Sequence, residues 1–162
     1  TFGGFTASFA SDERFHALRM PLDQNWKFAV IIPDYEVRTA DARRAMPKEI
    51  AVKDSVFTTS HAIAMIEALR SGSEELLAEA CQDVLHEPCR RKLIKDYDSV
   101  RASAKAAGAP AFFISGSGST MIALTKSETV AERFIELVRA RHPNFAGHVL
   151  HAASDGVRVE TK

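Results

Sequence analysis

Residues 111–125 read AFFISGSGSTMIALT and place two short apolar runs on either side of a glycine- and serine-rich tip. Residues 111–114 and 121–125 have the aromatic and branched side chains typical of buried strands. The six residues between them favour a tight reversal, so the stretch predicts a β-hairpin with a glycine-rich tip. It is not a Walker loop, because it has no lysine and leads into a strand instead of a helix.

Upstream, residues 26–32 are rich in branched and aromatic side chains and stop at Pro33-Asp34, which predicts a buried strand and a turn. Capping residues and helix breakers predict four helices before the hairpin. These are a short helix with Thr39 as N-cap and Pro47 after it, a helix from Asp54 to about Leu69 ended by Gly72, a helix capped by Ser73 whose apolar stripe runs up to His86, and residues 98–107 ended by Gly108. In the second helix, broad burial is predicted for Val56, Phe57, Ile63, Ile66 and Leu69.

Downstream, Ser127 is expected to cap an amphipathic helix that Pro143 ends, and residues 148–152 alternate as a strand. A further strand is expected at residues 157–159, after an Asp-Gly turn. The order from residue 26 is β-α-β-β-α-β with extra helices in the first crossover, which predicts a ferredoxin-like α+β domain over residues 26–162. Residues 4–10 and 14–20 predict a separate hairpin, and we interpret residues 1–25 as the remnant of another domain.

Composition excludes several classes of protein. With 21 Lys+Arg against 21 Asp+Glu, the chain has no excess charge for binding nucleic acid or an anionic membrane. Its longest apolar run, residues 28–32, is far shorter than the ~20 residues of a membrane-spanning helix. The two cysteines, Cys81 and Cys89, are expected to be reduced thiols in a cytoplasmic protein. The six histidines show no metal-ligand spacing, so no metal site is expected.

Three groups of residues are candidates for binding an anion. Thr39 and Arg43 are four apart and share a helix face, which suits a carboxylate or phosphate, although a capping residue beside a solvated arginine explains them equally well. Arg90 begins a short basic run after Pro88, a pattern that is more often a solvated helix end. The backbone of Gly116, Ser117 and Gly118 is able to converge on an anion or to serve as a purely structural turn.

Several segments, read in order, resemble the C-terminal half of the homoserine kinase family, within the GHMP small-molecule kinases. They are Gly3-Gly4-Phe5-Thr6, Ile32-Pro33-Asp34-Tyr35-Glu36-Val37 followed by residues 39–43, Met46-Pro47-Lys48-Glu49-Ile50, Leu85-His86-Glu87-Pro88-Cys89-Arg90, and Ile114-Ser115-Gly116-Ser117-Gly118-Ser119-Thr120. The resemblance implies ATP- and Mg²⁺-dependent phosphorylation of the hydroxyl of L-homoserine in threonine biosynthesis. It also implies that residues 1–25 belong to the family's N-terminal domain.

By the same resemblance, Thr39, Arg43 and Arg90 are expected to bind homoserine, with the two arginines holding its carboxylate. Gly116, Ser117 and Gly118 are expected to lie near the phosphate site, and Ser119 stands where the family usually has proline. The family's ATP-binding loop and magnesium ligands belong to its N-terminal half, and no segment here matches that loop. The chain alone is therefore expected to be inactive, to bind neither ATP nor Mg²⁺ tightly, and to work with that N-terminal half in a homodimer.

Three alternatives remain at this point. Another GHMP kinase, of the mevalonate or diphosphocytidyl-methylerythritol type, would share the fold and the glycine-rich tip without needing Thr39, Arg43 and Arg90 together. A non-enzymatic, ferredoxin-like amino-acid-binding module would bind its ligand through this chain alone. A purely structural or dimerisation domain would show no response to homoserine.

Overall fold

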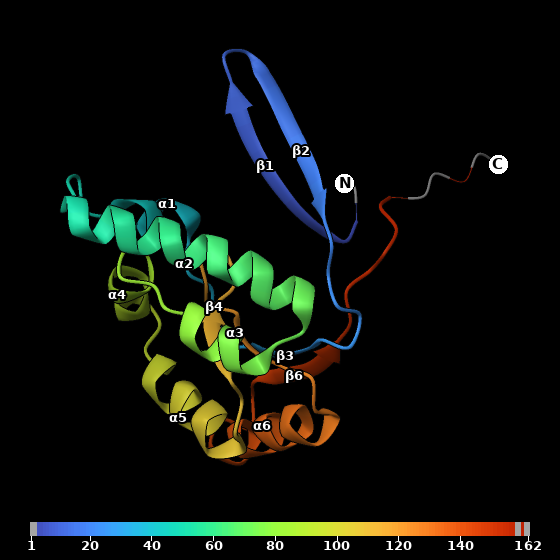
Figure 1. Ribbon diagram of the computed structural model, residues 1–162. Helices are drawn as coiled ribbons and strands as arrows, with labels where there is room; N and C mark the ends of the chain where they lie inside the picture. Colours follow the sequence, from blue (N-terminus) through green and yellow to red (C-terminus); the bar gives the residue numbers. More distant parts are fainter. Residues whose placement is uncertain (1–2, 158–159, 161–162) are drawn as a thin grey trace.

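Four strands form one antiparallel sheet in the computed structural model, which describes residues 3–157 and residue 160. The strand order is β4-β5-β3-β6, with β3 at Lys27–Ile32, β4 at Ala111–Ile114, β5 at Met121–Thr125 and β6 at Ala146–Leu150 (Figure 1). This is the strand order of a ferredoxin-like sheet, so the predicted α+β fold class is confirmed. Both strands of the 111–125 hairpin have their predicted bounds, whereas β6 begins two residues earlier than predicted.

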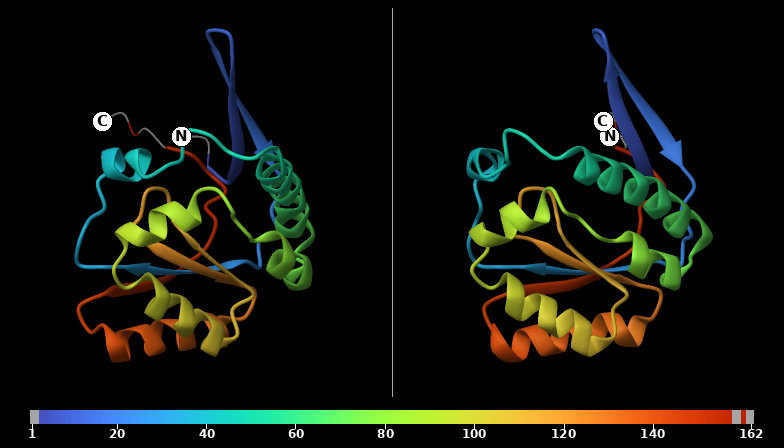
Figure 2. Two further views of the ribbon diagram at one scale, coloured as in Figure 1. Left: turned by 90° about the vertical axis from the view of Figure 1, so that its left-hand side faces the viewer. Right: turned by 60° about the vertical axis from the view of Figure 1, so that its left-hand side comes forward.

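Two helices cover one face of this sheet and complete the larger core. These are α5 (Tyr97–Ala107) and α6 (Glu128–Arg141), which lie side by side beneath the sheet in Figure 2. Val100 and Phe134 are fully buried against Ala29 and Met121 of the strands. As predicted, the Ser127 hydroxyl accepts a hydrogen bond from the Val130 amide at the start of α6, and Gly108 ends α5 in the left-handed conformation.

The opposite face of the sheet packs against α2 (Val52–Ser71) and α3 (Glu74–Ala80). Trp26, 1% exposed, joins the layers, because its indole N–H donates to the Leu69 carbonyl at 2.9 Å. Ser73 caps α3 as predicted. The predicted continuation of this helix to His86 is wrong: α3 ends at Ala80, and the chain then turns into α4 (Glu87–Arg90) and the 3-10 helix η1 (Arg91–Leu93).

Two further predictions about the inserted helices are wrong. The N-cap of α2 is Ala51, three residues before the predicted Asp54. Its broad burial is also not observed, because Val56 is 63% and Ile63 is 65% exposed, while Leu69 near the helix end is buried. The apolar residues of α2 are distributed around the helix, so within the described residues the sheet covers only part of them.

The predicted N-terminal hairpin is present and forms its own two-stranded sheet. It comprises β1 (Phe5–Ser11) and β2 (Arg14–Met20), and Figure 1 shows it projecting away from the body of the molecule. Its base is held by the segment after β6, because Gly4 N–H donates to the Ala153 carbonyl and Arg19 to the Ser154 carbonyl. Phe15 at its far end is 91% exposed.

The described residues after β6 contain no strand, and the predicted strand at 157–159 lies mostly outside the described residues. Within the part of the chain that the structure describes, no helix is long and apolar enough to cross a membrane.

Candidate functional site

The glycine-rich tip between β4 and β5 is a tight turn whose conformation requires glycine. Ser115 N–H donates to the Thr120 carbonyl at 2.9 Å, and Gly118 N–H donates to the Ser115 carbonyl at 3.0 Å. Gly118 has φ +86°, and a Cβ atom there would lie 2.8 Å from Ile94 Cδ1. A side chain at position 118 would therefore strain the backbone and displace the end of the Ile94 side chain.

Two of the three predicted substrate-binding residues contact this tip from different helices. Thr39 opens α1 (Thr39–Arg44), and its hydroxyl lies 3.4 Å from the Ser117 hydroxyl. Arg90 ends α4, and its Nη1 donates to the Gly116 carbonyl at 2.7 Å. In both views of Figure 2 the tip lies between α1 and α4. The fold thus brings together residues that are 78 and 26 positions apart in the sequence.

The predicted capping role of Thr39 is wrong. Arg38 is the N-cap of α1, and the helix has no side-chain cap. Because Thr39 is the first residue inside the helix, its hydroxyl is directed to Ser117 instead of to the helix amides. This removes the simplest structural explanation for a threonine at this position.

Arg43 lies one turn after Thr39 on the same helix and is exposed. The nearby carboxylate of Asp41 is occupied by Arg38 at 2.7 Å and by Arg44, and these hydrogen bonds, with that of Arg38 foremost, lower the pKa of Asp41. Among the described residues, the Arg43 side chain has neither a hydrogen bond nor an ion pair. Its guanidinium is therefore free to bind an anion.

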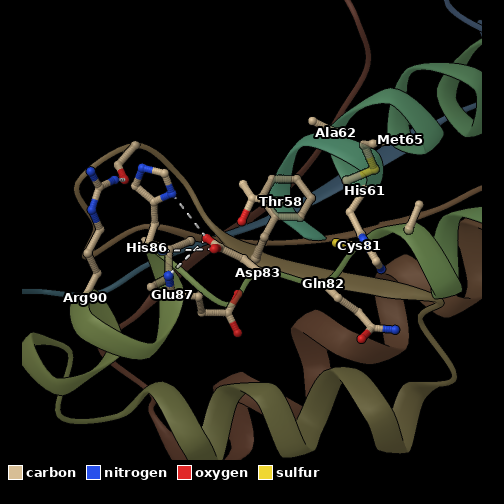
Figure 3. Close-up of a pocket in the computed structure, with 14 residues that line it drawn as sticks. Thr58, His61, Ala62, Met65, Cys81, Gln82, Asp83, His86, Glu87 and Arg90 are labelled. Atoms are coloured by element: carbon tan, nitrogen blue, oxygen red, sulfur yellow. Dashed lines mark hydrogen bonds and ion pairs between the residues drawn. The ribbon is translucent and has the colours of Figure 1, made fainter. Parts of the chain in front are cut away.

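A pocket of about 220 Å³ lies beside Arg90, between α2, the segment after α3, and α4 (Figure 3). Apolar side chains, including Met65, Phe113 and Ile114, form part of its wall. Two buried polar atoms that belong to its lining residues, Thr58 Oγ1 and Arg90 Nε, have no hydrogen-bond partner. Sequence reasoning missed Thr58, because nothing in the pattern of α2 marks which of its polar residues faces inward.

The acidic residues of this pocket are held by the protein itself. Asp83 accepts hydrogen bonds from the backbone N–H groups of Leu85, His86 and Glu87, which fixes the start of α4. Glu87 accepts a hydrogen bond from the Tyr97 hydroxyl, and burial together with this bond raises the pKa of Tyr97. The His86 ring faces Asp83, with Nδ1 3.6 Å from Oδ2, while Glu87 bonds to Tyr97.

The pocket also presents no reactive thiol. Burial, aided by the charge of Glu87, raises the pKa of Cys81 from 9.0 to about 11, so at neutral pH this residue is a protonated thiol. Cys81 and Cys89 are both free. The arrangement of cation, hydroxyl and apolar wall is suited to binding a small polar molecule, with chemistry supplied from outside the pocket.

Ser119, at the position where the resemblance leads one to expect proline, is tied into the fold. Its side chain is buried, and its hydroxyl donates to the Tyr35 carbonyl. The substitution therefore replaces a ring constraint by a hydrogen bond between the tip and the segment after β3. We expect the tip to keep its shape.

Comparison with known proteins identifies the fold of this chain. Residues 65–144 match the family model described as GHMP kinases C terminal. The solved structure of homoserine kinase from Cytophaga hutchinsonii superposes with a TM-score of 0.86 at 29% identity, over 96% of this chain and 50% of that chain. The structure of Leishmania major mevalonate kinase shares the fold at a TM-score of 0.67 and 17% identity. The chain therefore has the fold of the GHMP kinase C-terminal domain.

The curated sequences that are similar to this chain include homoserine kinases. The enzyme of Aquifex aeolicus is 34% identical over 97% of this chain and 54% of its own length. That of Microchaete diplosiphon is 40% identical over 78% of this chain and 41% of its own length. The chain thus spans about half the length of the curated relatives it matches, and it resembles the C-terminal half of homoserine kinases.

Proposed function

We propose that the protein containing this chain is a homoserine kinase, which transfers a phosphoryl group from ATP to the side-chain hydroxyl of L-homoserine and forms O-phospho-L-homoserine for threonine biosynthesis. The observation that carries the proposal is the meeting of Thr39 and Arg90 on the glycine-rich tip, in a chain similar to homoserine kinases along almost its whole length. In this proposal residues 26–162 form the C-terminal domain and residues 1–25 belong to the N-terminal domain.

Each proposed site residue has a chemical role. Arg43 and Arg90 bind the homoserine carboxylate, since a guanidinium pairs with a carboxylate through parallel hydrogen bonds. Thr39 positions the substrate beside the tip, and Gly116, Ser117 and Gly118 keep the tip close to the transferred phosphoryl group. Such positioning is the main contribution a protein makes to phosphoryl transfer.

ATP and Mg²⁺ are proposed to bind mainly to the N-terminal half of the protein. Among the described residues there is no group of three or more His, Cys, Asp or Glu side chains that could hold a metal ion. The tip has no lysine to contact phosphates. We propose that the isolated chain lacks a complete nucleotide and magnesium site and is inactive. The proposed protein acts in the cytoplasm as a homodimer.

The N-terminal half is also the proposed partner of the exposed apolar surface. Val52, Val56 and Ile63 of α2 are 81%, 63% and 65% exposed, and they recur at helical spacing along one side of the helix. Ile63→Ser is expected to change the stability of the isolated chain by less than about 0.5 kcal/mol and to destabilise the complete protein by more. Equal effects in both, measured by urea unfolding, would contradict this contact.

The function is tested by ADP release from the complete open reading frame that encodes this chain. The wild type is expected to release ADP only when L-homoserine is present, and Arg43→Ala is expected to abolish that dependence. Arg133→Ala, an exposed arginine of α6, is the control and should behave as wild type. Turnover with another alcohol and none with homoserine would assign the protein to a different branch of the superfamily. Homoserine-dependent ADP release by the isolated 162-residue chain would contradict its proposed inactivity.

A further inference from the structure

The pocket beside Arg90 has two sides of different chemistry. Arg90 reaches it from α4 and carries a permanent positive charge, whereas Thr58 reaches it from α2 with a neutral hydroxyl (Figure 3). We propose that Thr58 is a substrate-binding residue: its hydroxyl accepts a hydrogen bond from the ammonium group of the amino-acid substrate whose carboxylate binds Arg90. The inference rests on the proposed function and names a contact that the family motifs described above do not include.

The position of Thr58 on α2 directs it into the pocket. Thr58, His61, Ala62 and Met65 all line the pocket, and their spacing of three, one and three residues places them on one face of the helix. Thr59, one position later, is exposed and does not line the pocket. The position of Thr58 around the helix axis therefore sets the direction of its side chain.

The hydroxyl of Thr58 is not satisfied by its own helix. Serine and threonine in helices commonly bond back to a carbonyl one turn earlier, and in α2 the hydroxyls of Ser60 and Ser71 do so, with Phe57 at 2.9 Å and Glu67 at 2.8 Å. Thr58 Oγ1 is buried and has no partner. A buried hydroxyl without a partner is unfavourable, which a bound substrate would correct.

Arg90, on the other side of the pocket, also has a buried polar atom without a hydrogen-bond partner. Its Nη1 is engaged by the Gly116 carbonyl, while its buried Nε has no partner. Because a guanidinium presents several N–H groups in one plane, a carboxylate can bind its remaining donors without breaking the bond to the tip. The pocket volume of about 220 Å³ is suited to a small molecule such as a four-carbon amino acid.

The other polar groups of the pocket make Thr58 the available acceptor on its α2 side. His61 Nδ1 lies 2.9 Å from the Phe57 carbonyl, which assigns a proton to Nδ1. On the opposite side, Asp83 accepts hydrogen bonds from three backbone N–H groups and faces the His86 ring, and Glu87 Oε1 accepts one from the Tyr97 hydroxyl. On the α2 side of the pocket, the oxygen whose lone pairs accept no hydrogen bond from the protein is therefore Thr58 Oγ1.

The test uses steady-state kinetics of the complete protein with L-homoserine and with 4-hydroxybutyrate, which lacks the ammonium group. Thr58→Val removes the hydroxyl and preserves the shape of the side chain. It is expected to raise KM for homoserine about fivefold to twentyfold, with KM for ATP unchanged. Thr58→Ser keeps the hydroxyl and should restore wild-type KM, and Thr59→Val is the matched control on the same helix and should have no effect.

The analogue separates a contact with the ammonium group from a structural effect. With 4-hydroxybutyrate, the wild type and Thr58→Val are expected to have the same KM, because the group that Thr58 binds is absent. An equal loss with both substrates would overturn the inference, as would unchanged homoserine KM in Thr58→Val. If the wild type shows no homoserine-dependent turnover, the proposed function fails and this inference fails with it.

Discussion

Replacing Arg90 by lysine tests whether one side chain both holds the tip and binds the substrate. In the structure, Nη1 of Arg90 donates to the Gly116 carbonyl at 2.7 Å, and its buried Nε remains without a partner. Lysine keeps the positive charge but has a single nitrogen at the end of a flexible chain. That ammonium group is not able to reproduce the two separate directions in which the guanidinium donates.

The magnitude follows from the number of bonds lost. If the lysine ammonium stays on the Gly116 carbonyl, the carboxylate of the substrate loses a hydrogen bond to a charged donor, which is typically worth about 1.5–3 kcal/mol. This corresponds to a fall in kcat/KM for homoserine of about 10- to 150-fold. If the ammonium follows the substrate instead, the tip loses its contact with α4, and the free energy of unfolding falls by about 1 kcal/mol.

The assay is steady-state kinetics on the complete protein, together with urea unfolding of the same samples. Arg91→Lys is the matched control, because Arg91 is the next residue, is exposed, and lines no part of the pocket. It should change kcat/KM by less than about twofold. A fall in kcat/KM of less than threefold for Arg90→Lys without a loss of stability, or an equal fall for both variants, would refute the assignment of Arg90 as a carboxylate-binding residue.

Three further predictions concern the fold and its titrating groups. Leu77→Ala leaves a cavity at a fully buried site beside Trp26 and should lower the free energy of unfolding by about 2–5 kcal/mol. The fluorescence of Trp26, the single tryptophan of the chain, reports the unfolding transition. A loss below about 1 kcal/mol would contradict the packing. Burial raises the pKa of Cys81 from 9.0 to about 11, so below pH 9 this thiol should react with iodoacetamide about a hundredfold more slowly than an unperturbed thiol. Peptide mass spectrometry measures the two rates, and equal rates would contradict the prediction. The hydrogen bond from Lys126 lowers the pKa of Asp23 below 3.8, so the stability this pair supplies is complete above pH 3.8 and is lost as the pH falls through the folded-state value. Unfolding measured against pH should show a smaller acid loss in Asp23→Asn, and an unchanged profile would count against the bond.

Local signals account for the part of the fold that the sequence predicts well. The hairpin at 111–125 is bounded by a glycine-rich turn that interrupts two apolar runs, and both effects act within a few residues. The serine caps at Ser73 and Ser127 and the left-handed glycine at Gly108 are equally local. Such elements do not depend on what the rest of the chain does.

The predictions that were wrong depend on contacts between distant segments. Threonine is a residue type that commonly caps helices, yet the Thr39 hydroxyl lies beside Ser117, 78 residues later in the sequence. The helix after Ser73 has an apolar stripe that continues past Ala80, but the chain leaves the helix, and Asp83 instead fixes the start of α4. Neither outcome follows from residue type or spacing, because each requires the position of another element.

The sequence likewise predicted only part of the proposed substrate-binding site. From composition and spacing alone, Thr39, Arg43 and Arg90 could equally be ordinary surface residues. The resemblance to a family of kinases made them candidates for substrate binding. The structure adds that Thr39 and Arg90 contact one turn from two helices, while Arg43 is an exposed cation without a partner among the described residues. Thr58 had no marker in the sequence and was found through its buried, unbonded oxygen.

The two faces of α2 connect the proposed site to the rest of the protein. One face carries Thr58 and Met65 into the pocket, and another presents Val56 and Ile63 to solvent at more than half of their full exposure. A helix with apolar residues on several sides is typical of a helix buried on several sides. If the N-terminal half covers the outer face, as proposed, the same contact fixes the rotation of α2 about its axis and hence the direction of the Thr58 hydroxyl. Docking of the nucleotide-binding half would then complete the amino-acid pocket without contributing a residue to that wall.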